Sequence, residues 1–164
     1  MKAVINTGAG GSEVLEIQER QEPVPGPSHV RVRVRASALN RADISQRLGR
    51  YPAPAGSPQD IPGLEYSGEI DATGPDVSMW KVGDRVMGIV GGGAHAEFLV
   101  AHEGEVMSVP SGLSMEEAAA IPEVFLTAFD AMFEQLHMSA GETLLIHAAG
   151  SGVGVSSCLQ RQRA

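Results

Sequence analysis

Valine and arginine alternate strictly from Val30 to Arg35, and no other stretch of the chain has so clear a pattern. Successive side chains of a β-strand point to opposite faces, so the three valines share one face and the three arginines share the other. The pattern predicts a strand with one buried face and one solvated face. The arginines could instead form an anion site, but the alternation accounts for them without one.

Further short strands, separated by turn-forming residues, are predicted along the first two thirds of the chain. They cover residues 2–6, 14–17, 65–72, 85–90 and 96–100. A helix is expected over Ala36–Leu48, with Gly49 at the position of a C-cap glycine. Many short strands at this spacing favour a small β-barrel or sandwich.

Beyond Ser111 the pattern becomes helical. Ser114 and Glu117 form a capping box, which predicts that a helix starts there. Pro122 breaks or kinks this helix, and an apolar stripe predicts a second helix over residues 124–136. The apolar run at residues 143–147 predicts a short buried strand.

A glycine-rich segment follows that apolar run, with glycine at positions 150, 152 and 154. Glycine lets the backbone turn tightly and approach a phosphate closely, and the start of the next helix offers free N–H donors. A strand followed by such a loop is the context in which proteins hold the pyrophosphate of a nicotinamide dinucleotide. The spacing is not the stricter G-x-G-x-x-G, so a plain tight turn is the alternative for the loop taken alone.

The composition argues against several classes of protein. The formal net charge of -8 disfavours nonspecific binding to nucleic acid or to an anionic membrane. The N-terminus is not expected to be a signal peptide, and no apolar run approaches the length of a membrane span. Because Cys158 is the only cysteine, neither an internal disulfide nor a multi-thiolate metal site is expected, which fits a cytoplasmic location.

Five motifs occur in order along the chain. They are Ala36–Asp43 (ASALNRAD), Pro62–Gly68 (PGLEYSG), Val82–Val86 (VGDRV), Ala118–Pro122 with Leu126–Phe129, and Leu145–Gly154 (LIHAAGSGVG). In this order and spacing the chain resembles the medium-chain dehydrogenase/reductase superfamily, in its zinc-free quinone oxidoreductase branch. Asn40-Arg-Ala-Asp43 with Arg50-Tyr51 is most similar to the tumour-suppressor-inducible quinone oxidoreductase type. The resemblance implies a mainly β, GroES-like barrel-type domain at residues 1–122, then the first strand and loop of an α/β Rossmann domain at residues 123–164.

In that family, hydride passes from NADPH or NADH to a quinone or another activated carbonyl or alkene. The resemblance implies that Asn40 and Tyr51 are catalytic and face the nicotinamide, and that Thr127 binds near its carboxamide. It also implies a pyrophosphate cradle made of Gly150, Ser151, Gly152, Val153 and Gly154. Taken without the family, Asn40 is equally well a helix cap, Tyr51 a packing residue and Thr127 an ordinary helix residue.

No metal is expected. Zinc-dependent relatives have a cysteine where Asn40 stands and a histidine where Leu64 stands. The five histidines are scattered without an H-x-x-x-H pair and favour core or surface roles: His29, His95, His102, His137 and His147. Without a Lewis acid, hydrogen-bond donors must polarise the carbonyl, which suits an easily reduced quinone. Glu65 and Asp43 are the candidate acid/base pair, although Glu65 is better explained as a structural carboxylate near the domain junction.

A complete Rossmann domain has about six strands, and this chain holds only the first, so we expect a C-terminally truncated product. The residue that would select NAD or NADP lies about 20 residues past the loop, outside the chain. We expect weak cofactor binding and a tendency to associate, because an isolated parallel strand leaves apolar surface uncovered.

Two functions follow from the sequence. One is an NAD(P)H-dependent quinone oxidoreductase acting on small-molecule quinones, with NADPH as the expected cofactor and neither nucleic acid nor membrane as a partner. The other is a non-catalytic GroES-like module that associates with or regulates full-length subunits. The natural substrate, the cofactor preference and a homo-oligomeric state are left open.

Overall fold

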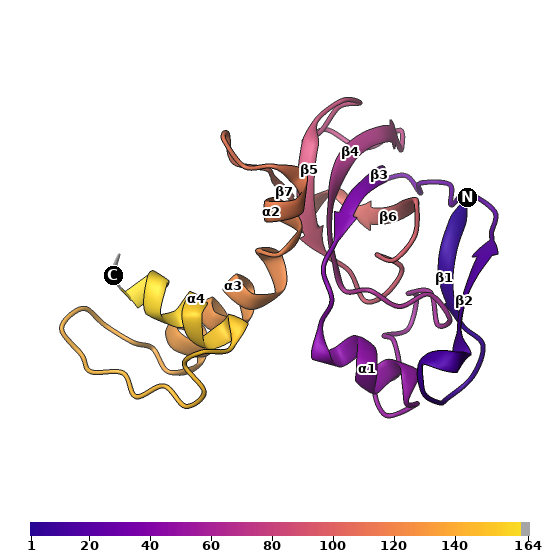
Figure 1. Ribbon diagram of the computed structural model, residues 1–164. Coiled ribbons are helices and arrows are strands. Elements are labelled where there is room, and N and C mark those ends of the chain that lie inside the picture. The colour runs from indigo at the N-terminus through magenta and orange to yellow at the C-terminus, as the bar shows by residue number, and fades with distance from the viewer. Residues whose placement is uncertain (162–164) are drawn as a thin grey trace. The chain divides into compact units, whose positions relative to one another are not determined.

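The computed structural model describes residues 1–161. The chain forms two compact units, Met1–Ala120 and Ile121–Ala164. The first unit is mainly β and the second is helical (Figure 1).

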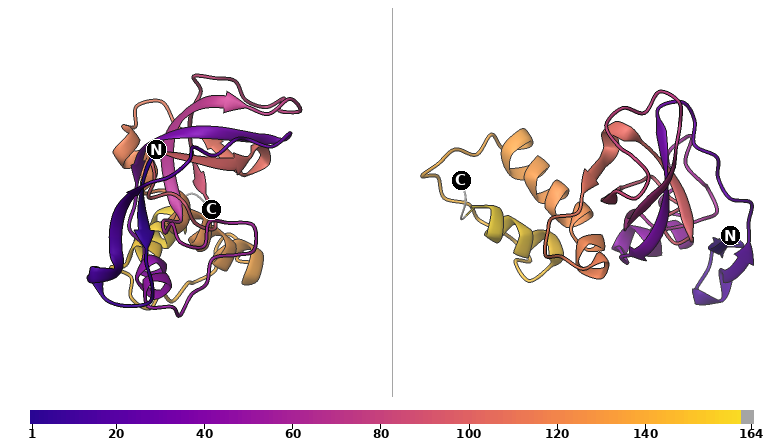
Figure 2. Two further views of the ribbon diagram at one scale, coloured as in Figure 1. Left: turned by 90° about the vertical axis from the view of Figure 1, so that its right-hand side faces the viewer. Right: turned by 90° about the horizontal axis from the view of Figure 1, so that it is seen from above.

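The first unit contains two antiparallel sheets. Strands β1 (Lys2–Asn6) and β2 (Leu15–Glu19) pair in a small sheet, with the short 3₁₀ turn η1 (Ser12–Val14) between them. The larger sheet has the order β6-β3-β4-β5-β7 and comprises β3 (His29–Ser37), β4 (Glu65–Thr73), β5 (Arg85–Ile89), β6 (Phe98–His102) and β7 (Val106–Ser108). Figure 2 shows the indigo β1–β2 pair beside the larger sheet, and a bridge between Ala3 and Ala96 joins β1 to the segment before β6.

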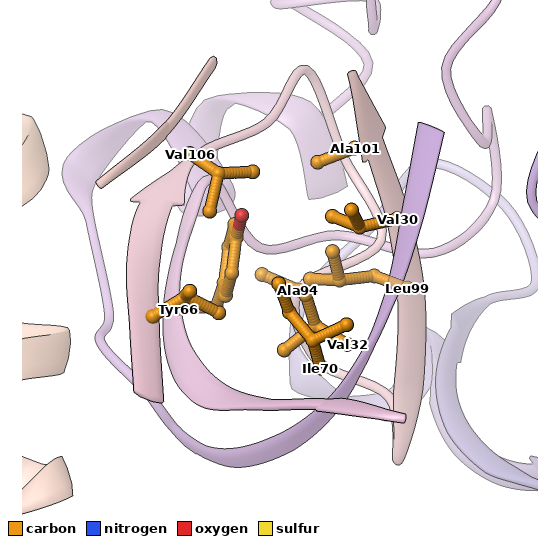
Figure 3. Packing of buried hydrophobic residues seen from close by; sticks show 9 residues of the cluster. Val30, Val32, Tyr66, Ile70, Ala94, Leu99, Ala101 and Val106 are labelled. Atoms are coloured by element: carbon orange, nitrogen blue, oxygen red, sulfur yellow. The ribbon is translucent and has the colours of Figure 1, made fainter. Parts of the chain in front are cut away.

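The valine face of β3 lies in the core, as the alternation predicts. Val30 and Val32 are fully buried, and they pack with Tyr66 and Ile70 of β4 and with Leu99 of β6. The sheet curves around these side chains, which point toward one another in Figure 3. This confirms the predicted barrel-type arrangement of short strands.

The arginine face of β3 is paired with carboxylates rather than left free. Arg31 donates two hydrogen bonds to the carboxylate of Asp71, at 2.9 and 3.0 Å, and Arg35 donates one to Glu69 at 2.9 Å. The guanidinium of Arg33 lies 4.8 Å from the ring centroid of Phe98. Acidic residues on β4 therefore offset this row of positive charge, so the face gives no support to the anion-site alternative.

The helix predicted over Ala36–Leu48 is shorter than expected. β3 continues to Ser37, and α1 spans only Arg41–Arg47. The helix starts after Asn40, whose backbone N–H donates to the carboxylate of Asp43 at 2.7 Å and so fixes the first turn. Gly49 has a φ of +71° and donates to the carbonyl of Gln46, which confirms the glycine C-cap.

The remaining elements of the first unit are short. The 3₁₀ turn η2 (Glu103–Glu105) precedes β7, and α2 (Met115–Ala119) ends the unit. The predicted capping box is confirmed, because Glu117 accepts from the Ser114 N–H at 2.8 Å and donates its own N–H to the Ser114 hydroxyl at 3.2 Å. Strand β7 was not predicted from the sequence.

The second unit is a pair of packed helices. α3 (Pro122–Phe129) continues into the π-helical turn η3 (Asp130–Gln135), and α4 (Gly152–Arg161) lies beside α3 (Figure 1). Pro122 begins α3, at a position where its missing N–H has no intrahelical acceptor to lose. The Gln160 side chain donates to the carbonyl of Phe125 at 2.9 Å and ties the two helices together.

The buried strand predicted at residues 143–147 is wrong. This segment pairs with no strand among the described residues, and Leu145 is 81 % exposed. A strand of a parallel sheet needs neighbouring strands to accept its hydrogen bonds and helices to cover its faces. An apolar run alone supplies neither.

Within residues 1–161, no helix is long and apolar enough to cross a membrane.

Candidate functional site

Asn40 lies in the short segment that connects β3 to α1, and two carboxylates hold it in place. Its side-chain N–H donates to Glu65 at 2.8 Å, and its backbone N–H donates to Asp43 at 2.7 Å. Glu65 is 2 % exposed, at the first position of β4. In the structure, Glu65 and Asp43, the predicted acid/base pair, both orient Asn40.

Asp43 is also the centre of a buried polar cluster. Its Oδ1 accepts the N–H of Gly63 at 3.2 Å, and its Oδ2, which binds the Asn40 N–H, lies 3.6 Å from Nε2 of His95. Nδ1 of His95 is in turn 2.9 Å from the hydroxyl of Ser37. The side chains of Asp43 and His95 are 10 % and 11 % exposed, so water screens this cluster little.

Gly63 fixes the position of His95. Its φ is +104°, and a Cβ there would lie 2.6 Å from the backbone nitrogen of His95 and 2.8 Å from its Nδ1. Only glycine combines this backbone conformation with so close an approach. The loop before β4 therefore holds the imidazole against α1.

This polar cluster borders a pocket of about 1030 Å³ in the first unit. Ser37, Asn40, Asp43 and His95 supply polar groups to its wall. Its apolar lining includes Leu15, Ile17, Val34, Leu39, Ile44 and Ala94. A pocket that combines an apolar lining with a few convergent polar groups is the usual form of a small-molecule site.

Ser37 and His95 were not singled out by the sequence. Serine is common, and His95 belonged to a scattered set with no ligand spacing. Of the predicted catalytic residues, Asn40 lines the pocket, whereas Tyr51 is 47 % exposed in the loop after α1 and is not among the described residues that line it.

The predicted cofactor residues lie in the second unit. Thr127 is on an exposed part of α3. The glycine-rich segment turns at Ala148, which has a φ of +55°, and enters α4 at Gly152. Ser151 caps this helix, because its hydroxyl accepts the N–H of Gly154 at 3.1 Å.

Each glycine of the segment has a different surrounding. A Cβ at Gly152 would lie 2.8 Å from a methyl group of Val124, and one at Gly154 would lie 2.6 Å from the carbonyl oxygen of Ala148. A Cβ at Gly150 would meet no described atom within 4 Å. Two glycines therefore permit close packing, and the third leaves backbone open to a ligand. The N–H groups of the first helical turn, at Gly152 and Val153, have no intrahelical acceptors and suit a phosphate.

Metal-ligating side chains do not converge. Within residues 1–161, no group of three or more His, Cys, Asp or Glu side chains is placed to hold a metal ion. His29 and His102 pack edge to face across β3 and β6, with ring centroids 5.3 Å apart. His95 takes part in the pocket cluster, and His137 and His147 are exposed.

The chain is similar in sequence and in fold to several known proteins. Residues 26–111 match the family model for the alcohol dehydrogenase GroES-like domain. A quinone oxidoreductase of Pseudomonas aeruginosa is 43% identical over 150 residues, which are 91% of this chain and 46% of that protein. The structure of the human synaptic vesicle membrane protein VAT-1 homolog-like protein matches with a TM-score of 0.92 and 34% identity, over 99% of this chain and 52% of that one.

The structure of CurK enoyl reductase is also similar. It matches with a TM-score of 0.90 and 31% identity, over 99% of this chain and 51% of that one. The chain thus spans about half the length of the proteins it matches. The matches confirm the predicted mainly β, GroES-like fold.

Proposed function

Because the chain belongs to the medium-chain dehydrogenase/reductase superfamily, through its alcohol dehydrogenase GroES-like domain, we propose that it is part of an NAD(P)H-dependent quinone oxidoreductase. The reaction is hydride transfer from NADPH to a quinone, or to a similar activated carbonyl or alkene, without zinc. The relatives named quinone oxidoreductase and enoyl reductase support this choice. The single cysteine fits a reducing compartment, and we propose a cytoplasmic location.

The observation that carries the proposal is the fixed amide of Asn40 in the pocket wall. One of its N–H bonds is directed to the buried carboxylate of Glu65, which sets the orientation of the amide. Its second N–H is then available to donate to a substrate carbonyl oxygen. Such an oriented donor stabilises the negative charge that grows on oxygen as the carbonyl is reduced.

The cofactor, when bound, supplies the hydride. The first turn of α4 and the open backbone at Gly150 are the groups of this chain that fit its pyrophosphate, and Thr127 is the proposed neighbour of the carboxamide.

The test is NADPH oxidation by this chain with an ortho-quinone as acceptor. Asn40→Ala should lower kcat about 10-fold or more, because it removes the oriented donor, and Tyr51→Phe should lower it through the loss of the proposed catalytic hydroxyl. Gln135→Ala removes an exposed amide of η3 and serves as the matched control. Equal rates for Asn40→Ala and the unsubstituted chain would contradict the assignment.

The second candidate is a non-catalytic GroES-like module that associates with full-length subunits. The exposed apolar segment at residues 143–147 favours it, because such a segment can pair with a sheet of another chain. Co-expression with a full-length relative tests it. Co-purification without NADPH oxidation by the chain alone supports the module, and turnover that Asn40→Ala abolishes supports the enzyme.

A further inference from the structure

We propose that Ser37 is a second substrate-binding group of the pocket and gives a proton to the substrate oxygen, with His95 and Asp43 as the positioning residues that restore that proton. This deepens the proposed function and rests on it, since it takes the pocket as the place where a carbonyl substrate is reduced. Its substrate class is a carbonyl compound with an apolar body.

The geometry is a row of three side chains, all of which line the pocket. The Ser37 hydroxyl lies 2.9 Å from Nδ1 of His95, and Nε2 of His95 faces the Asp43 carboxylate at 3.6 Å. Asp43 is itself fixed by the N–H groups of Asn40 and Gly63. A row of this kind passes protons between its members and the ligand that contacts its last group.

One atom of the row, Nε2 of His95, lies beside a carboxylate without bonding to it. Nε2 of His95 is buried and has no hydrogen-bond partner among the described residues, at a distance from Asp43 that is longer than a hydrogen bond. Other buried polar atoms among the described residues also lack a partner, the hydroxyl of Tyr66 among them, but Nε2 of His95 lies beside a carboxylate. An imidazole with one such nitrogen beside a carboxylate can take up a second proton without leaving its place.

Asp43 decides where the protons of His95 reside. In the neutral ring, a proton on Nε2 faces the carboxylate favourably, whereas a lone pair there would face negative charge. Nδ1 then accepts from Ser37, and the lone pairs of the serine face the pocket. In the imidazolium both nitrogens donate, so Nδ1–H binds the serine oxygen and the serine O–H turns to the substrate.

The proton balance of the step follows from these two states. Hydride addition from the reduced nicotinamide breaks the carbonyl π bond and leaves a negative charge on oxygen. The Ser37 O–H bond breaks as the O–H bond of the product forms, and the Nδ1 proton of His95 passes to Ser37. The imidazolium becomes the neutral ring with its proton on Nε2. The carbonyl is reduced, the nicotinamide is oxidised, and solvent later returns one proton to His95.

The charges around the cluster favour an oxyanion. Besides Asp43, the charged residues that line the same pocket are Lys2, Arg35, Arg41, Arg47 and Glu97. Arg35 is paired with Glu69, but Lys2, Arg41 and Arg47 are cations as well, and cations stabilise negative charge on a substrate oxygen. The apolar lining accommodates the rest of the molecule.

The first experiment needs neither cofactor nor turnover. The ring nitrogens of His95 are followed by ¹⁵N NMR in the full chain, with phenanthrenequinone as the added probe. We expect the neutral ring to carry its proton on Nε2, and the quinone to shift the Nδ1 signal in the unsubstituted chain and in Ser37→Thr but not in Ser37→Ala. A neutral ring protonated on Nδ1, or a signal that the quinone leaves unmoved, overturns the proposal.

The second experiment measures NADPH oxidation against pH. Ser37→Ala should lower kcat about 100-fold, the usual contribution of one general acid, and Ser37→Thr should restore most of it. His95→Gln should flatten the alkaline decline of kcat, while Ser78→Ala, on the exposed surface, should match the unsubstituted chain. An unchanged pH profile in His95→Gln overturns the relay. A chain that shows the NMR response but oxidises no NADPH contradicts the proposed function and not the arrangement of the row.

Discussion

Tyr66 carries the only hydroxyl in the larger hydrophobic cluster, and replacing it with phenylalanine should stabilise the protein. The residue is fully buried, and its hydroxyl has no hydrogen-bond partner within residues 1–161. Figure 3 shows the hydroxyl end of the ring directed toward Val106. Tyr66→Phe removes the unpaired group and leaves the ring in place.

Two terms set the size of the effect. An unpaired buried polar group costs about 1–3 kcal/mol. Deleting one oxygen atom leaves a void of roughly 10–15 Å³, which costs about 0.3 kcal/mol at about 24 cal/mol per Å³. The net gain is about 1–2 kcal/mol in the free energy of unfolding. With an m-value of about 2 kcal/mol/M, the urea midpoint should rise by about 0.5–1 M.

The same hydroxyl gives the gain a pH dependence. Burial, and then the charge of Glu105, raise the pKa of Tyr66 well above its usual value. Above about pH 10 the unfolded chain therefore loses this proton while the folded chain keeps it. The folded state then binds more protons, so the free energy of unfolding falls with pH, by up to about 1.4 kcal/mol per unit. Phenylalanine has no such proton, so the advantage of Tyr66→Phe should grow from pH 9 to pH 11.

Urea unfolding at pH 7, and at two values above pH 9, measures both effects. Tyr51→Phe is the matched control, because that ring is 47 % exposed and lies outside the hydrophobic cluster that surrounds Tyr66. A urea midpoint that falls on Tyr66→Phe would refute the reasoning, since it would mean that the hydroxyl is paired. A pH-independent difference between the two proteins would refute the account of the raised pKa.

Three further substitutions should lower the free energy of unfolding, each measured by urea unfolding at pH 7. Gly63→Ala should cost about 2 kcal/mol or more, because a Cβ at positive φ would meet the backbone of His95; a smaller cost would show that this loop yields. Asp71→Ala should cost about 2 kcal/mol, because the mostly buried guanidinium of Arg31 loses its two-bond partner and keeps only Glu22 and the carbonyl of Pro23; an effect below 1 kcal/mol would mean that the pair is solvated. Ser114→Ala should cost about 1 kcal/mol through the lost cap of α2, whereas Ser114→Asp should leave stability nearly unchanged.

The parts of the fold that the sequence predicts are those with a local cause. The alternation at Val30–Arg35 marks β3 because period two is a property of the strand itself. The capping box at Ser114 marks α2 because both partners lie within one turn. Strand β7 escapes prediction because Val106–Ser108 is too short to show a period, and only its pairing with β5 makes it a strand.

The strand at residues 143–147 was predicted wrongly because its formation depends on distant partners and not on a local cause. Its composition suits a buried strand, but a strand is defined by its partners, and residues 1–161 place none beside it. The helix over Ala36–Leu48 was predicted too long for a related reason. Pairing with Tyr66 and Ser67 of β4 keeps Ala36 and Ser37 in the sheet. That pairing cannot be inferred from the local sequence around Ala36.

The candidate site shows most clearly what a single sequence leaves out. Asn40 could be selected because its motif stands at a helix start. His95 could not, since its role comes from Ser37 on one side and Asp43 on the other, which only the fold brings together. The segment PGLEYSG gains a physical meaning in the same way: Gly63 admits the imidazole by lacking a Cβ, and Glu65 holds the amide of Asn40. Gly63 in the loop before β4 and Glu65 at the start of β4 thus position His95 and Asn40 in the pocket wall, so a substitution at Gly63 should disturb proton transfer, and one at Glu65 should disturb carbonyl binding.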